Sequence, residues 1–180
     1  MKPIDKLLQR WRFERIRPWL WPKARVLDIG CGDGAMFRRF PWLGPSVGID
    51  PTLASPQQIG PARLVPGLFP HGLNTGIRFD VISLLAVLEH VPREVLPTFA
   101  QQIAERLVAG GRLLITVPSP AVDPILDVLK MLRIVDGMAL EEHHGFEVAQ
   151  TRPTFEQAGL RCLEASRFQL GLNNFFAFEA

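Results

Sequence analysis

Two neighbouring stretches decide the fold: VLDIGCGDG at residues 26–34, and VGIDP at residues 47–51. The first is an apolar run that enters a loop with glycine at every second position. The second is an apolar run that ends on the carboxylate of Asp50. Glycines let a backbone turn tightly and approach a ligand closely, and an acid after the next strand can accept hydrogen bonds from a ribose. Together the two stretches predict a pocket for a nucleoside-containing cofactor.

The charge of the glycine loop indicates which cofactor this is. Asp28 and Asp33 lie in the loop, where carboxylates would repel a pyrophosphate at the start of the following helix. The glycines also follow the pattern G-x-G-x-G rather than the dinucleotide pattern G-x-G-x-x-G, and the chain has no phosphate-binding P-loop motif. S-adenosylmethionine (SAM) carries adenosine, an ammonium and a sulfonium without phosphate, so the pattern favours SAM over a dinucleotide.

At these residues the chain resembles the class I SAM-dependent methyltransferases, in particular their small "type 11"-like domains. VLDIGCGDG and VGIDP are similar to the first two motifs of that family. FDVISLLAVLEHVP (residues 79–92) and AGGRLLITVPSP (residues 109–120) are similar to its fourth- and fifth-strand segments. The resemblance implies a doubly wound, Rossmann-like α/β sheet of seven strands in the order 3-2-1-4-5-7-6, mostly parallel with one antiparallel strand. It also implies SAM as the cofactor, but says little about the methyl acceptor.

Hydrophobic spacing predicts where the elements lie. We expect strands at residues 25–29, 46–50, 64–65, 79–84, 112–117, 161–169 and 174–179, and no full helix between residues 51 and 70. Helices are expected at residues 34–40, 94–108, 121–135 and 154–158, together with an N-terminal helix broken or kinked at Pro18.

The cofactor site is predicted at the carboxyl ends of the strands, where open α/β sheets bind ligands. The resemblance implies that Asp28 lies at the floor of the loop, where it either orders loop N–H groups or meets the ammonium of SAM, and Asp50 is expected to accept from the ribose. The alternatives are that Asp28 caps the next helix and that Asp50 is an ordinary turn residue. No acid follows the third strand, so backbone groups and apolar packing from Leu68 and Phe69 are expected to hold the adenine. The predicted cofactor-binding residues are Asp28, Gly30, Cys31, Gly32, Gly34, Asp50, Pro51, Leu68 and Leu85.

Two polar clusters are candidates for the acceptor side. Glu89 and His90 follow the fourth strand and look like a Glu-His pair that recurs in the family, although the pair could equally shape the loop. His143 and His144 belong to the run EEHH at residues 141–144. Either histidine could act as a general base, and a solvated turn is the alternative. Neighbouring residues seldom converge on one ion, so no metal site is expected.

Composition is that of one globular domain over residues 1–180, with an N-terminal helical segment (1–21) and a core (22–180). The chain has no apolar run long enough for a membrane span, no signal peptide and two cysteines taken to be reduced, so a cytoplasmic location is expected. The net charge of +2 indicates no general nucleic-acid surface. Residues 1–25, however, hold eight Lys and Arg against two Asp and Glu. This basic, aromatic segment is a lid, a peripheral membrane contact or a core-covering helix.

The predicted function is transfer of a methyl group from SAM to a small-molecule, lipid-linked or sugar-type acceptor. The chain has no tyrosine and no N-P-P-Y signature of nucleic-acid amino methylation, so no nucleic-acid partner is expected. The alternative is a SAM-binding regulatory or partner protein without transferase activity. An NAD(P)-dependent reductase is a third hypothesis, which the two loop carboxylates oppose.

Overall fold

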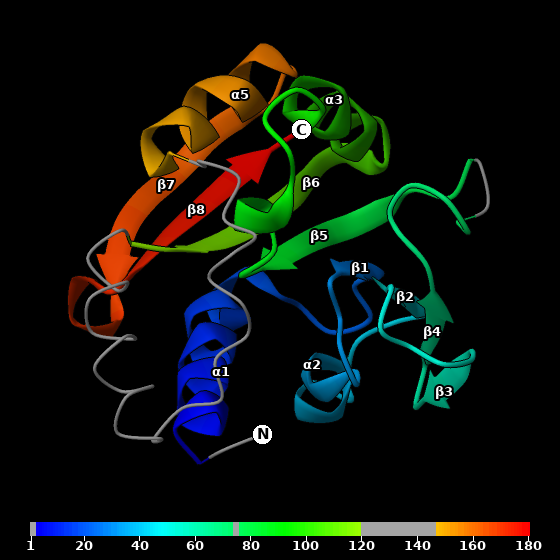
Figure 1. The fold of residues 1–180 in the computed structure, drawn as a ribbon. Coiled ribbons are helices and arrows are strands. Elements are labelled where there is room, and N and C mark those ends of the chain that lie inside the picture. The colour runs from blue at the N-terminus through cyan, green and yellow to red at the C-terminus, as the bar shows by residue number, and fades with distance from the viewer. Residues whose placement is uncertain (1–2, 74–75, 120–146) are drawn as a thin grey trace.

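The computed structural model describes residues 3–73, 76–119 and 147–180, which form one mixed sheet with helices on both faces (Figure 1). The strand order in this described part is β3-β4-β2-β1-β5-β6-β8-β7. The five central strands from β4 to β6 run parallel, whereas β8 runs antiparallel to both of its neighbours. The strands are β1 (Val26–Ile29), β2 (Ser46–Asp50), β3 (Gln57–Ile59), β4 (Ala62–Pro66), β5 (Phe79–Leu85), β6 (Leu107–Pro118), β7 (Arg161–Phe168) and β8 (Asn173–Glu179).

The doubly wound fold class is confirmed, and the expected strand count needs one correction. Without β3, the other strands follow the order 3-2-1-4-5-7-6 that the family resemblance implied. The additional strand β3 pairs antiparallel with β4, with Ile59 opposite Ala62. Only Gly60 and Pro61 separate those two residues, and Gly60 has the positive φ (+54°) that tight hairpin turns need. The stretch between residues 51 and 70 therefore folds into an edge hairpin.

Helices α1 (Pro3–Ile16) and α2 (Ala35–Arg39) cover one face of the sheet, and α3 (Leu96–Glu105) and α5 (Thr151–Gln157) cover the other (Figure 1). Short 3₁₀ turns are η1 (Arg17–Trp19), η2 (Leu88–His90), η4 (Val148–Gln150) and η5 (Gln169–Gly171). As expected, α1 ends just before Pro18. Helix α3 ends earlier than the predicted residue 108, because Leu107 pairs with Phe79 and opens strand β6. The helix expected at residues 121–135 lies outside the described residues.

The two faces of the sheet carry two separate hydrophobic cores, because side chains alternate along each strand. In β1, Leu27 and Ile29 pack toward α3 and α5, whereas Val26 packs toward α1 and α2. The same alternation in β5 places Ile82 on the α3 side and Val81 on the α1 side. Asp28 is two residues from Val26, so its carboxylate enters the α1 side. The face that Asp28 enters therefore decides which helix can reach the candidate site.

Helix α1 is fixed to that face at both flanks. Phe13 is buried and meets Phe40 edge-on, with 6.1 Å between the ring centroids. On the other flank, Arg15 lies 4.3 Å over the Phe175 ring of β8 and pairs with Glu164 of β7. Helix α1 therefore lies across the sheet between α2 and the β7–β8 pair, and it covers core in the way that one of the three hypotheses for residues 1–21 expected.

Candidate functional site

A backbone hydrogen bond and positive φ angles set the shape of the glycine loop between β1 and α2. The Gly30 N–H donates to the carbonyl of Ile49 (2.8 Å), which ties the loop to the end of β2. Gly30 has a φ of +76°, and a Cβ built there would lie 2.3 Å from a methyl of Val87. Gly32 also has a positive φ (+52°), but no protein atom lies within 4 Å of the position that its Cβ would take. The tip of the loop thus leaves room for a ligand to approach the backbone.

Asp50, at the end of β2, orders this loop. One carboxylate oxygen accepts from the N–H of Gly32 (2.8 Å), and the other accepts from both the N–H and the hydroxyl of Thr52 (2.8 and 2.6 Å). Ordering of loop N–H groups was one of the two roles expected of Asp28, whereas here Asp50 binds a loop N–H. A carboxylate has about four acceptor positions, so Asp50 retains capacity for a ribose hydroxyl.

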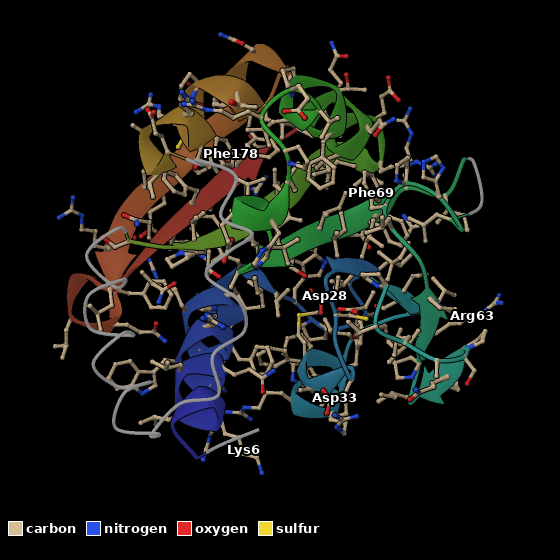
Figure 2. The ribbon with its side chains drawn as sticks, viewed as in Figure 1. Lys6, Asp28, Asp33, Arg63, Phe69 and Phe178 are labelled. Atoms are coloured by element: carbon tan, nitrogen blue, oxygen red, sulfur yellow. The ribbon has the colours of Figure 1, made fainter. Side chains whose placement is uncertain are left out.

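Asp28 lies deeper, under the loop and facing α1 (Figure 2). Its carboxylate accepts a hydrogen bond of 2.7 Å from the hydroxyl of Ser83, its neighbour across the β1–β5 pair. Burial raises the pKa of Asp28 to about 7, the Ser83 hydrogen bond opposes that rise, and the nearby charge of Asp50 adds to it. A buried carboxyl with such a pKa is a functional-site candidate, because a cation placed beside it would favour the ionised form.

A cavity of about 50 Å³ lies between the glycine loop and α1, smaller than typical ligand sites of roughly 300–1,000 Å³. It brings together predicted residues from β1, the loop and β5 with residues of α1 and α2 that were not predicted as site residues. The predicted lining residues are Asp28, Gly30, Cys31 and Leu85, and the others are Gln9, Arg12, Phe13 and Met36. Helix α1 therefore forms a wall of the cavity as well as covering core.

Arg12 is the residue that sequence analysis missed. It is half-buried in the wall of the cavity, and its charge also lowers the pKa of Glu89. The basic pattern of residues 1–25 was the available signal. That pattern did not say which of eight cations would turn inward, because the answer depends on how α1 docks on the sheet.

Asp33 lies away from the cavity, contrary to the electrostatic argument built on it. Its side chain is 73% exposed, pairs with Arg38 (2.6 Å) and accepts from the N–H of Ala35 at the start of α2. Of the two loop carboxylates, it is Asp28 that lines the cavity and would repel a pyrophosphate there. Cys31 is buried in the cavity wall, and burial raises the pKa of its thiol, which keeps the thiol protonated.

The predicted adenine side is only partly formed by side chains. Leu68 is 65% exposed, and Pro51 is exposed as well. Phe69 is buried in the other core instead, edge-on to Phe99 with 5.5 Å between the ring centroids. The N–H of Gly67 donates to the carbonyl of Asp50 (3.2 Å), which brings the β4 loop beside the end of β2. Gly34 begins α2, and Ile59 and Leu64 occupy the space beside it.

The loop after β5 places Glu89 and His90 in η2, next to the site. Glu89 is buried, and its Oε2 has no hydrogen-bond partner among the described residues. Burial raises the pKa of Glu89 to about 7, while a backbone hydrogen bond and the charge of Arg12 act against that rise. Upstream, Ala86 has a left-handed backbone (φ +59°), held by bonds from its N–H to Thr116. Such strain clusters at functional sites.

Some predictions lie outside what the structure describes. His143 and His144 fall within residues 120–146, so their position relative to the cavity stays a prediction. Among the described residues, no three His, Cys, Asp or Glu side chains gather as metal ligands would. No helix in the described ranges is long and apolar enough to span a bilayer.

Comparison with known proteins identifies the family. A family model described as a methyltransferase domain matches residues 4–165. The chain is 27% identical over 166 residues to the ubiquinone biosynthesis O-methyltransferase of Colwellia psychrerythraea, covering 79% of this chain and 63% of that protein. It is 31% identical over 118 residues to the tRNA U34 carboxymethyltransferase of Sodalis glossinidius, covering 58% of this chain and 36% of that protein. The chain thus spans less than two thirds of these relatives.

A solved structure shows the same fold at low sequence identity. The 1,6-didemethyltoxoflavin-N1-methyltransferase of Burkholderia thailandensis, solved with 1,6-didemethyltoxoflavin and S-adenosylhomocysteine, aligns with a TM-score of 0.69 at 19% identity, covering 94% of this chain and 76% of that one. The chain belongs to the class I SAM-dependent methyltransferase family, whose cofactor is SAM.

Proposed function

We propose that this chain transfers a methyl group from SAM to an oxygen of a small-molecule, lipid-linked or sugar-type acceptor. The observation that carries the proposal is that Arg12 and Asp28 line one cavity. The methionine end of SAM carries a carboxylate, an ammonium and a sulfonium. A cavity that offers one guanidinium and one buried carboxyl complements those charges, whereas the pyrophosphate of a dinucleotide would have Asp28 against it.

In this proposal each part of the site has a separate task. Arg12 pairs with the carboxylate of SAM, and Asp28 faces its positive charges. Asp50 binds a ribose hydroxyl while it continues to hold the N–H of Gly32. Leu68 covers the adenine from the β4 loop. The roles assigned to Gly30, Cys31, Gly34, Pro51 and Leu85 are to shape the pocket wall.

The acceptor side is proposed at the loop after β5. Bound SAM supplies an activated methyl group, so the protein's main contribution is to align the acceptor with it, which can lower the barrier by about 7–11 kcal/mol. The acceptor hydroxyl must lose its proton as the new bond to carbon forms. Glu89 has a pKa raised to about 7, suitable for taking that proton near neutral pH, and His90, His143 and His144 are the other candidates.

The type of acceptor follows from the relatives and from the charge. The Colwellia psychrerythraea relative is named as an O-methyltransferase, which favours an oxygen acceptor. The Sodalis glossinidius relative is named for a tRNA, but a net charge of +2 favours a small acceptor over a nucleic acid. We also propose that residues 1–180 act as a single domain in the cytoplasm.

Calorimetry on the purified chain tests the cofactor site. SAM and S-adenosylhomocysteine should bind, and NADH should not. Arg12→Ala should weaken SAM binding by about tenfold or more, because a hydrogen bond to a charged group is worth about 1.5–3 kcal/mol. Arg63→Ala, an exposed position on β4, is the matched control and should bind SAM as the wild type does. Binding of NADH without SAM would overturn the proposal.

Mass spectrometry tests the transfer. Cell extract incubated with labelled SAM, with and without the protein, should show a methylated product that depends on the protein. Separate small-molecule, lipid and tRNA fractions identify the acceptor class. A chain that binds SAM but forms no S-adenosylhomocysteine with any fraction would be a SAM-binding regulatory or partner protein instead.

A further inference from the structure

The outer face of α1 is not used by the cofactor site. Lys6 and Arg10 are exposed, as are Leu7 (49%) and Trp11 (43%). Residues four apart lie one above the other on a helix, so Leu7 and Trp11 form one apolar row, and Lys6 and Arg10 form a basic row beside it. The opposite side of α1 holds buried Phe13 and Ile16 and the cavity residues Gln9 and Arg12, so these rows point away from the core.

A third exposed apolar side chain lies on a turn attached to this helix. The side chain of Gln169 donates to the carbonyl of Leu8 in α1 (2.8 Å), which attaches η5 to this helix. The next residue, Leu170, is 93% exposed and has a left-handed backbone (φ +57°). A leucine that is almost wholly in water buries little apolar surface against the described residues. We call Lys6, Leu7, Arg10, Trp11 and Leu170 the α1 surface.

The nearby described carboxylates pair with cations other than Lys6 and Arg10. Glu14, the acid on the outer side of the helix, pairs with Arg39 and Arg17. Glu164 of the neighbouring strand pairs with Arg15. Lys6 and Arg10 form no ion pair with a described residue, and Figure 2 shows Lys6 at the outer end of α1, away from the sheet. The surface therefore presents positive charge and apolar side chains together.

We infer that the α1 surface docks on an anionic lipid bilayer. Basic side chains are attracted by acidic headgroups, while leucine and tryptophan insert at the headgroup boundary. Because the inner side of the same helix walls the cavity, docking would place the cavity next to the bilayer. This inference deepens the proposed function, since it favours a lipid-linked acceptor. With few charges and a small apolar area, binding should be weak, reversible and dependent on acidic lipid.

Vesicle co-sedimentation of the full chain tests the inference. The wild type should bind vesicles that contain phosphatidylglycerol at low salt, should release at high salt, and should not bind vesicles of phosphatidylcholine alone. The variants K6E/R10E and L7Q/W11Q should each lower binding by about tenfold or more, and glutamine and glutamate keep the helix propensity of α1.

Two matched controls lie far from α1 in the fold. R63E reverses an exposed charge beside the β3–β4 edge of the sheet, where Figure 2 labels Arg63. I77Q removes an exposed apolar side chain (42%) just before β5. Both controls should sediment as the wild type does.

The outcomes separate this inference from the proposed function. Wild-type protein that stays in solution with acidic vesicles at low salt overturns it, as does binding that the α1 variants leave unchanged. A dimer that K6E/R10E or L7Q/W11Q dissociates would show that a second copy covers the surface, and RNA that competes selectively would show a nucleic-acid site. SAM affinity measured on each variant should equal that of the wild type, so loss of membrane binding is not loss of the cofactor site.

Discussion

At the scale of single residues, the site depends on where carboxylates are buried. Asp28 and Asp50 lie near the carboxyl ends of adjacent parallel strands, but they make different contacts. Asp50 holds the N–H of Gly32 and the turn at Thr52, whereas Asp28 is sealed beneath the loop with Ser83. The environment, not the residue type, gives Asp28 its raised pKa. Two predictions follow from these positions.

SAM binding should release a proton from Asp28 near neutral pH. The free protein holds Asp28 protonated below its pKa of about 7, and the positive charges of SAM favour the carboxylate. Affinity should therefore rise as the pH increases through about 7 and then level off. Calorimetry in buffers of different ionisation enthalpy measures the proton. Asp28→Asn should bind SAM more weakly and should release no proton on binding. Asp80→Asn, at the far end of β5, should release the proton as the wild type does.

Gly30→Ala should destabilise the fold and abolish SAM binding. The new Cβ would lie 2.3 Å from Val87 in a left-handed backbone, so overpacking of about 1–3 kcal/mol adds to the strain. Gly60→Ala is the control, because it has a similar φ (+54°) and no atom within 4 Å of the new Cβ. Chemical denaturation should show a larger loss for Gly30→Ala. Equal losses would mean that the contact with Val87 is relieved without cost.

At the scale of elements, α1 determines the shape of the site. The glycine loop, the ends of β1 and β5 and Met36 of α2 form one side of the cavity, and α1 closes the other. Its docking depends on Phe13 against Phe40 and on Arg15 against β7 and β8. A cavity built on that contact should be sensitive to changes that never touch a ligand.

Arg15→Ala should weaken both the fold and SAM binding. The change removes the ion pair with Glu164, a hydrogen bond of 2.8 Å to Ser166 and the contact with the Phe175 ring, together worth about 1–3 kcal/mol. SAM affinity should fall because Arg12 moves with α1. Arg152→Ala breaks only an exposed i,i+4 pair with Glu156 and should change stability by about 0.5 kcal/mol or less. Thermal unfolding and calorimetry measure the two effects, and unchanged SAM affinity in Arg15→Ala would contradict this role of α1.

At the scale of the whole molecule, two buried carboxyls couple the stability of the fold to pH. Asp28 in β1 and Glu89 in η2, the turn after β5, both have pKa values raised to about 7. Each binds a proton more tightly in the folded chain than in the unfolded chain. The folded state therefore gives up stability as the pH rises, since ionisation is easier after unfolding.

Stability should therefore fall between about pH 4 and pH 7 as these two groups ionise, by an amount on the order of a few kcal/mol. Urea unfolding across this range measures it. Asp28→Asn and Glu89→Gln should each flatten the curve, and SAM should restore stability at the alkaline end. Glu156→Gln, an exposed position on α5, is the control. A stability that rises across this window in the wild type would contradict the burial of both carboxyls.

The sequence by itself determined the parallel core of the sheet and the position of the glycine loop between β1 and α2. Apolar runs flanked by glycine and aspartate are local signals, and strand β2 lies at the predicted residues 46–50. Local signals were weaker where tertiary pairing competes with propensity. Leu107 belongs to a helical pattern in the sequence but pairs with Phe79 in the sheet. Residues 57–59 form an edge strand that a two-residue turn connects to β4.

Only the tertiary structure decided which side chains share the cavity. Arg12 enters it because α1 docks with that side on the sheet, and Asp33 leaves it because Arg38 draws its carboxylate outward. Phe69 and Leu68 are neighbours in sequence, yet one is buried in the core and the other is exposed. A sequence pattern records which residues alternate along an element. Which neighbour each side of an element faces is set by packing between elements that are distant in the chain. For that reason the three-dimensional fold was needed to define the site.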